Sequence, residues 1–214
     1  MMPRDELKKF GRLLAEKGLT WGRSGNLSLR LGESSFLINA RGSDLGTLGG
    51  DELTVCRIGN DRWEGTKPPS IEKELHRLIY QRQEGAKAIV HAHPFYATLI
   101  SCTQTPLNTD LFPEAMAYLG DVVRVTYAHP GSRELAQAVA EKAASSEVLL
   151  LENHGTLVWG SSLDEAMLKT ETLELLSRLV ITARGAGIEL NYLGEAVQED
   201  FRRHLKRLSG LSGA

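Results

Sequence analysis

Two histidines separated by a single residue, His91 and His93, end a short apolar run that begins at residue 86. On a β-strand, residues i and i+2 point to the same face, so both imidazoles can converge on one point. Neutral imidazole is a good ligand for zinc and similar divalent metals. Pro94 then ends the strand, and strand ends in α/β folds are where functional sites collect. The pair indicates a metal site, although two surface histidines would show the same spacing.

A third histidine, His154, follows a second apolar run over residues 148–151 and precedes Gly155, which permits a sharp turn. Taken alone, this pattern is also typical of a helix-capping or core histidine. If the two runs form adjacent strands of one sheet, three imidazoles can reach one metal. A fourth position then stays open for substrate, as in catalytic zinc sites.

A carboxylate lies where it could serve such a metal. Pro69 and Ser70 suit the first turn and cap of a helix predicted over residues 71–82. Glu72 and His76 are four residues apart and share one face of that helix. A carboxylate beside a three-histidine metal is a natural general base, or a fourth ligand that substrate displaces. Solvated helices often carry the same pair.

Two glycine-containing turns flank predicted strands, at Ser24-Gly25-Asn26 and at Arg41-Gly42-Ser43. Such turns present backbone N–H groups to anions, and the forked guanidinium of Arg41 suits a phosphate or a carboxylate. Each turn is equally typical of an ordinary hairpin.

Size and composition exclude several classes of protein. The chain has 214 residues, 42% hydrophobic and 24% charged, which fits one globular domain over residues 1–214. A net charge of −2 with interspersed signs argues against a nucleic-acid partner, and no apolar stretch is long enough for a membrane span. The only cysteines, Cys56 and Cys102, are too few for a disulfide framework and indicate a cytoplasmic protein.

The pattern of apolar residues predicts an irregular alternation of helices and strands. This favours a three-layer α/β/α domain with a mixed, mostly antiparallel sheet. Helices are expected over residues 4–18, 71–82, 94–102, 132–144, 163–184 and 195–208, the last followed by a Gly/Ser tail. Strands are expected over residues 26–30, 35–39, 53–58, 86–91, 122–127, 148–151 and 156–159.

Taken in order, these motifs resemble the class II aldolase/adducin-head family, whose type member is L-fuculose-1-phosphate aldolase. The resemblance implies a mostly antiparallel sheet flanked by helices, and fourfold homotetramers with active sites at subunit interfaces. The motifs that carry it are Gly25-Asn26-Leu27-Ser28-Leu29-Arg30, Pro69-Ser70-Ile71-Glu72 with His76, Val90-His91-Ala92-His93, Tyr127 through Pro130-Gly131 to Glu134-Leu135, and Glu152-Asn153-His154-Gly155.

The resemblance also implies roles for single residues. One Zn²⁺ per chain, or another divalent metal, would be held by His91, His93 and His154. Glu72 would be the acid/base. The substrate phosphate would lie near Asn26, Gly42 and Ser70.

Three departures from the family pattern bear on the substrate. Ile71 replaces a serine that often contacts phosphate. Arg41 replaces a threonine, so it either takes over the phosphate or meets a carboxylate. No tyrosine occurs near Phe112 in the position of the fuculose enzyme's proton donor, because Tyr118 is out of register.

These features predict a zinc-dependent aldolase of carbohydrate metabolism that cleaves a small ketose phosphate to dihydroxyacetone phosphate and an aldehyde through a metal-stabilised enediolate. Alternatives within the family are a decarboxylase of an oxo-acid phosphate, a dehydratase, or an epimerase. Related epimerases carry Asp at the position of Glu72. A non-catalytic, adducin-head-like interaction module is the alternative of another class, and the complete set of histidines argues against it.

Overall fold

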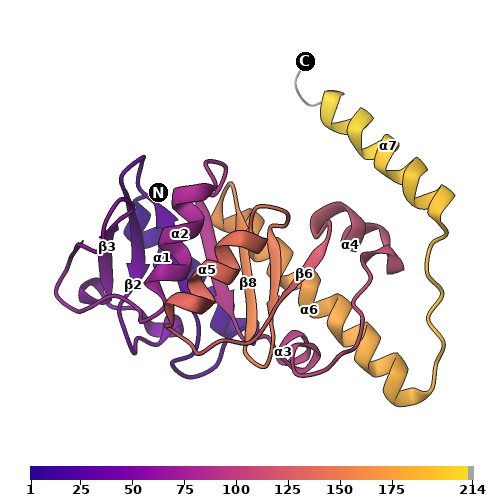
Figure 1. The fold of residues 1–214 in the computed structure, drawn as a ribbon, viewed down its shortest axis with the longest axis horizontal. Helices are drawn as coiled ribbons and strands as arrows, with labels where there is room; N and C mark the ends of the chain where they lie inside the picture. The colour runs from indigo at the N-terminus through magenta and orange to yellow at the C-terminus, as the bar shows by residue number, and fades with distance from the viewer. Residues whose placement is uncertain (212–214) are drawn as a thin grey trace.

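The computed structural model describes the backbone of residues 1–211 and the side chains of residues 1–207. One sheet of eight strands runs through the molecule in the order β4-β3-β2-β1-β5-β8-β7-β6 (Figure 1). Only β6 and β7 pair in parallel, which confirms the predicted mixed, mostly antiparallel sheet. The strands are β1 (Asn26–Arg30), β2 (Ser35–Asn39), β3 (Leu53–Arg57), β4 (Trp63–Glu64), β5 (Ala88–Ala92), β6 (Val122–Val125), β7 (Val148–Leu151) and β8 (Gly155–Gly160).

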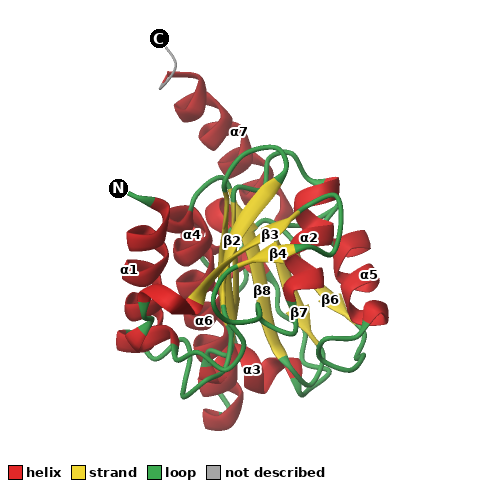
Figure 2. Cartoon of the chain, turned by 90° about the vertical axis from the view of Figure 1, so that its left-hand side faces the viewer, coloured by secondary structure: helices red, strands yellow, loops and turns green. Residues whose placement is uncertain are grey.

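Helices cover both faces of this sheet, giving the three-layer α/β/α domain that the sequence predicts. Two of them, α2 and α5, pack together on one face, while α1, α3 and α6 cover the other (Figure 2). A separate apolar core fills the space on each side. The helices are α1 (Pro3–Glu16), α2 (Lys73–Arg82), α3 (Phe95–Ser101), α4 (Pro113–Tyr118), α5 (Arg133–Lys142), α6 (Leu163–Ala186) and α7 (Glu195–Leu211).

Alternation along the strands decides which side chains meet which helices. In β5, Ile89 belongs to the core under α2 and α5, whereas Val90 belongs to the core under α1 and α6. His91 therefore returns to the side of α2 and α5. Because Asn26 of β1 pairs with His91, it shares that side. A strand period of two thus brings polar side chains under the start of α2.

Several element boundaries differ from those predicted. Helix α2 begins at Lys73, because the Ser70 carbonyl accepts from the Lys73 amide in a turn and the Ser70 hydroxyl accepts from the Glu72 amide. Strand β5 is shifted, starting at Ala88 and ending at Ala92, and α7 continues to Leu211. Residues 212–214 of the predicted tail lie outside the described residues. Helix α4 and strand β4 are not among the predicted elements, because both are too short for a periodic signal.

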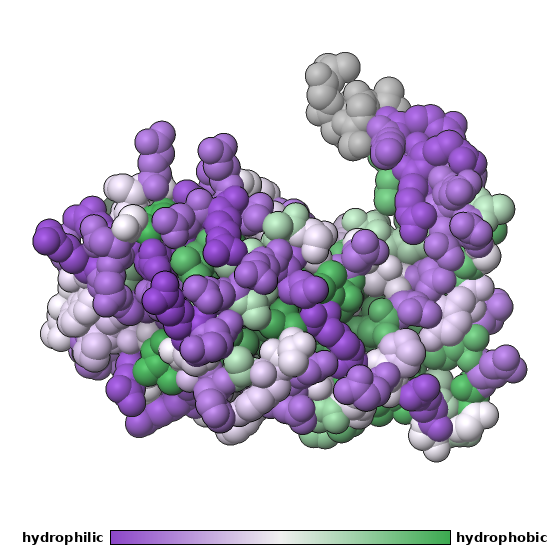
Figure 3. Space-filling view, viewed as in Figure 1, coloured by the Kyte–Doolittle hydropathy of each residue, from purple (hydrophilic) through white to green (hydrophobic). Residues whose placement is uncertain are grey.

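The last helix, α7, projects away from the body and follows an extended segment after α6 (Figure 1). Its surface is mostly hydrophilic in the space-filling view (Figure 3). The Leu193 amide donates to the Asp110 carbonyl, and Gln198 Nε2 donates to Asp110 Oδ2 at 3.0 Å, which anchors the start of the helix. Across residues 1–211, no helix combines the length and the apolar character needed to span a bilayer.

Two leucines of α6 test the assignment of its buried face. Leu173 is fully buried, whereas Leu175, two residues later, is 49% exposed. We expect Leu173→Ala to lower the free energy of unfolding by about 2–5 kcal/mol, because it leaves a cavity in the core. Leu175→Ala should cost only about 0.5 kcal/mol. Urea unfolding followed by circular dichroism measures both values, and equal losses would contradict this packing.

Candidate metal centre

Three imidazoles converge at one end of the central strands. His91 lies on β5, and His93 lies one residue beyond the strand end, where its amide donates to the Leu19 carbonyl at 3.2 Å. His154 lies in the tight turn between β7 and β8. One nitrogen from each ring falls within 4.8 Å of the other two, and His91 and His154 have ring centroids 4.8 Å apart.

The route by which His154 arrives differs from the one expected. Strands β5 and β7 are not neighbours, because β8 lies between them. His154 instead reaches β5 from the turn that precedes β8. In that turn Asn153 adopts a positive φ of 53°. Gly155 approaches His93 so closely that a Cβ would lie 2.8 Å from the ring carbon Cδ2, so any larger residue would displace the imidazole.

Glu72 closes this group of side chains from the side of α2. Its Oε2 is 3.2 Å from His91 Nε2, and its Oε1 is 3.5 Å from His154 Nε2. The Asn26 amide nitrogen donates to Oε2 at 2.8 Å. Glu72 is only 6% exposed and occupies the N-cap position of α2 instead of a place within the helix. The carboxylate therefore faces the three imidazoles from a fixed backbone.

The charges of the group follow from burial and mutual contact. Burial alone would raise the pKa of the Glu72 carboxyl, but the adjacent His91 and His154 outweigh it and hold the pKa well below its usual range. Burial would likewise lower the pKa of His91, yet the Glu72 charge raises it above the ordinary value. Burial lowers the pKa of His93 to about 3 and of His154 to about 4, so both rings are neutral near pH 7.

Unsatisfied buried atoms show that these residues fit a metal ion. Four buried side-chain atoms of this group have no hydrogen-bond partner: His91 Nε2, His93 Nδ1, His154 Nδ1 and Glu72 Oε1. His91 Nδ1 lies 2.8 Å from the Thr156 carbonyl oxygen, so it carries the proton and leaves the lone pair on Nε2. Buried polar groups without partners are costly, and each nitrogen or oxygen that binds a divalent cation would gain one. Three imidazoles with a carboxylate form a donor set that zinc accepts.

A cavity of about 330 Å³ opens beside the histidines. Its wall contains all the residues predicted from the resemblance to surround the substrate, namely Asn26, Arg41, Gly42 and Ser70, together with Glu72, His93 and His154. The bridge between Ala40 and Pro69 brings the Arg41 turn next to Ser70. The side chain of Arg41 is exposed and makes no hydrogen bond or ion pair among residues 1–211. It remains available to an anion.

Arg23, Asn39 and Pro130 also line the cavity, and we did not predict them as site residues. Arg23 supplies a second exposed guanidinium at the rim. Asn39 is a buried polar residue at the end of β2, and its Oδ1 accepts from the Leu27 amide at 3.0 Å. A polar residue ending an apolar strand was the available signal for Asn39. Arg23 and Pro130 give no such signal, because separate loops bring them here.

Tyr118, considered as a proton donor, does not lie at this cavity. It lines a different hollow of about 480 Å³ at the other end of β7 and β8, near Lys169. None of the described tyrosines lines the histidine cavity. Among the residues that line this cavity, Glu72 is therefore the one with a carboxyl group, which can transfer a proton through an oxygen atom.

A family model described as the class II aldolase and adducin N-terminal domain matches residues 5–181. The chain belongs to this family. Its members include enzymes of more than one activity, and the relatives below differ in what they catalyse.

Three relatives show the range. A 3-oxo-tetronate 4-phosphate decarboxylase from Haemophilus influenzae is 34% identical over 202 residues, covering 92% of this chain and 95% of the relative. An L-fuculose phosphate aldolase from Methanococcus maripaludis is 34% identical over 171 residues, covering 80% and 91%. The solved structure of YgbL from Klebsiella pneumoniae is 36% identical and superposes with a TM-score of 0.86, covering 93% and 97%.

Metal content tests the proposed ligands directly. We expect about one divalent metal per chain in the parent protein, measured by elemental analysis. His93→Ala should lose it, because two imidazoles and a carboxylate hold the ion far less tightly. His204→Ala is the matched control, since His204 lies exposed on α7. A His93→Ala protein that keeps its full metal complement would contradict the assignment.

Proposed function

We propose that the chain is a metal-dependent decarboxylase of a small, phosphorylated 3-oxo acid. The observation that carries this proposal is the pair of uncommitted guanidinium groups, Arg23 and Arg41, at the rim of the histidine cavity. A 3-oxo-tetronate 4-phosphate has a carboxylate at one end and a phosphate at the other, so two cationic side chains match its two anionic ends. The decarboxylase from Haemophilus influenzae, similar over 92% of the chain, supports the same substrate class.

Decarboxylation of such a substrate requires stabilisation of a negative charge and the addition of a proton. Breaking the bond between C1 and C2 releases CO₂ and leaves its electron pair on C2, delocalised onto the oxygen at C3. A proton added at C2 then gives the ketone. When bound, a divalent cation supplies positive charge that stabilises negative charge on that oxygen. Glu72 is ionised, so it would first accept a proton from water and then pass it to C2 through Oε1, because the Asn26 amide occupies Oε2.

The phosphate or carboxylate end of the substrate would meet Arg41 and the turn around Gly42 and Ser70. Gly42 has a positive φ of 75° and leaves its surroundings open, so the backbone can approach an anion. Asn26 lines the same cavity, and its amide also orients Glu72.

A second candidate is the aldolase first predicted from the sequence. It is favoured by the carboxylate of Glu72 facing three imidazoles and by the similar L-fuculose phosphate aldolase. Both reactions cleave a carbon–carbon bond beside a carbonyl and need the same stabilisation of an enolate. A dehydratase would use the same group, and Glu at position 72 disfavours an epimerase. The complete donor set argues against a non-catalytic interaction module.

We further propose that the metal is zinc and that the protein is a cytoplasmic enzyme of carbohydrate metabolism. We also propose that it forms a fourfold homotetramer. Imidazole and carboxylate ligands favour zinc without excluding similar divalent ions.

The proposed tetramer is supported by an apolar recess of about 250 Å³ next to His93, which includes Trp21 and Phe95. These two side chains are 70% and 69% exposed, which suits a subunit contact beside the site.

Activity with matched substrates tests this function. We expect release of CO₂ from 3-oxo-tetronate 4-phosphate, with slower or no cleavage of L-fuculose 1-phosphate. Glu72→Gln should lower kcat about 10²- to 10⁴-fold while metal content is retained, because the amide cannot move the proton. Glu74→Gln is the control, since Glu74 pairs with Arg77 outside the cavity. Turnover of fuculose phosphate alone would select the aldolase, and a metal-loaded parent inactive on both would contradict the proposal.

A further inference from the structure

Two matching rows of polar side chains lie between α2 and β1. Glu72, His76 and Tyr80 are spaced by four residues, so they follow one face of α2 and its N-cap. Asn26, Ser28 and Arg30 are spaced by two, so they follow the facing side of β1. The two rows form an interface that runs from the metal centre to the far end of α2.

Consecutive contacts connect these side chains. Asn26 Nδ2 donates to Glu72 Oε2 at 2.8 Å, and Asn26 Oδ1 lies 2.5 Å from His76 Nε2. The Ser28 hydroxyl lies 2.6 Å from His76 Nδ1 and 2.7 Å from the Tyr80 hydroxyl. Ser28 and His76 are fully shielded from solvent, and Asn26 and Tyr80 are each 2% exposed. A polar chain of this kind inside a protein core requires every member to have its partner.

The chemistry of the groups fixes the direction of donation. A carboxylate can only accept, so Asn26 turns its NH₂ group to Glu72 and its oxygen to His76. His76 must then donate from Nε2. Burial lowers the pKa of His76 to about 3, so the ring is neutral and its Nδ1 accepts from the Ser28 hydroxyl. The Tyr80 hydroxyl donates to Ser28 in turn. Every hydrogen bond therefore points toward Glu72.

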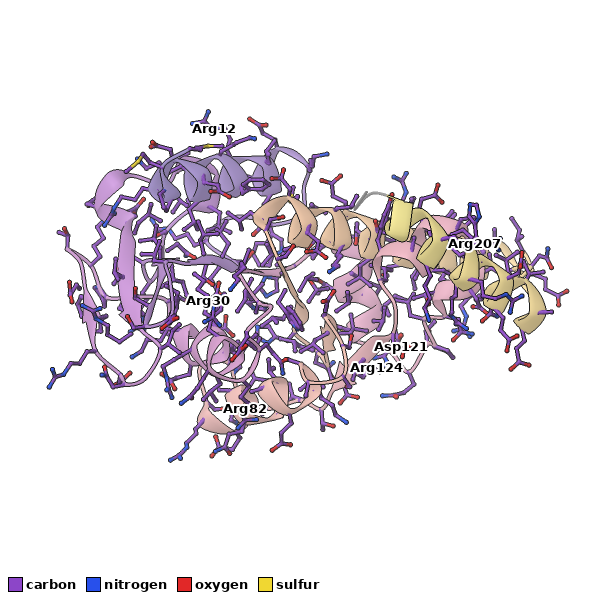
Figure 4. The ribbon with its side chains drawn as sticks, turned by 90° about the horizontal axis from the view of Figure 1, so that it is seen from above. Arg12, Arg30, Arg82, Asp121, Arg124 and Arg207 are labelled. Atoms are coloured by element: carbon purple, nitrogen blue, oxygen red, sulfur yellow. The ribbon has the colours of Figure 1, made fainter. Side chains whose placement is uncertain are left out.

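Arg30 holds the far end of the chain in place. Its guanidinium carbon lies 4.9 Å from the centroid of the Tyr80 ring. Its nitrogens donate to the carbonyls of Ala86, Tyr80 and Gln83, the first at 2.8 Å and the last at 3.1 Å. Figure 4 labels Arg30 within the body of the molecule. The Tyr80 ring is thereby held against β1.

We propose that His76 is a positioning residue that acts as its Nε2–H tautomer. It fixes the orientation of the Asn26 amide, which keeps Oε2 of Glu72 occupied and directs Oε1 to the substrate. Without the Nε2–H donor, the buried Oδ1 of Asn26 would lose its partner, and the amide would lose the contact that holds it in place against Glu72. The effect on turnover rests on the proposed function, whereas the tautomer and the amide orientation do not.

Nuclear magnetic resonance of zinc-loaded protein labelled with ¹⁵N-histidine tests the structural part without any substrate. We expect His76, assigned by its absence in His76→Gln, to be neutral at pH 7 with its proton on Nε2. A neutral ring with its proton on Nδ1 would overturn the proposal, because Nε2 could then not donate to Asn26. A charged ring would overturn it as well, because Nδ1 could then not accept from Ser28.

Two substitutions at His76 test its effect on catalysis. His76→Leu should lower kcat about 10- to 100-fold with little change in KM and with metal content retained. His76→Gln should recover much of the loss, because glutamine also offers one donor and one acceptor side. Should His76→Leu fail to fold, Ser28→Ala replaces it, since it removes the donor that holds His76 Nδ1 as an acceptor.

The outcomes separate the two claims. An unchanged kcat in a folded His76→Leu or Ser28→Ala protein would overturn the positioning role. Equal losses in His76→Leu and His76→Gln would also overturn it, because rescue depends on the donor. A parent protein that binds zinc and shows the Nε2–H tautomer, yet turns over no tested substrate, would contradict the proposed function alone.

Discussion

The structure depends on one constraint: four ionisable side chains, the buried Glu72 and His91 and the half-buried His93 and His154, lie together at one end of the central strands. Glu72 meets the histidine group within 3.2 to 3.5 Å, and each isolated charge would be costly there. Contact between the two groups lowers the pKa of Glu72 and raises that of His91, whereas burial lowers the pKa values of His93 and His154 and keeps both rings neutral near pH 7. Such a group carries little net stabilisation for the fold. A bound cation would offset the cost of bringing these side chains together.

The scaffold around this group serves to hold it with little freedom. Strand pairing sets Asn26 beside His91, and β8 carries the turn that supplies His154. Gly155 has no side chain at the point where the turn passes His93, so the imidazoles of His93 and His154 can approach each other. On the other side, α2 begins at the point where Glu72 faces the rings. Rigid elements on both sides therefore determine the geometry of the site, and the loops at its rim carry Arg23 and Arg41, which we propose bind the anionic ends of the substrate.

Much of this could be predicted from the sequence, because the relevant signals are local. The spacing of His91 and His93 on an apolar run, and the run before His154, indicated the three imidazoles. The alternation of short strands and helices indicated the mixed sheet. The helix start at Lys73 was harder to predict, because the Ser70 turn delays it. Arg23 and Asn39 were missed at the cavity, since only the pairing of β1 with β2 and β5 brings them near His93.

The order of β5, β8 and β7 in the sheet explains why the sequence did not predict which segment brings His154 to the other two histidines. Two apolar runs that each lead to a histidine suggest neighbouring strands, yet a hairpin partner can insert between them. Here β8 does so, pairing with both β5 and β7. The histidine still reaches the centre, because the turn before β8 lies beside the end of β5. The sequence therefore predicted that the three histidines lie close together, but the order of the strands could be seen only in the structure.

The most direct test of the central claim is anomalous X-ray diffraction from crystals of the zinc-loaded protein, recorded on both sides of the zinc absorption edge. The account predicts one strong anomalous peak per chain, within coordination distance of His91, His93 and His154. No peak at this position, or a peak bound by other residues, would contradict the assignment of these imidazoles as a metal centre.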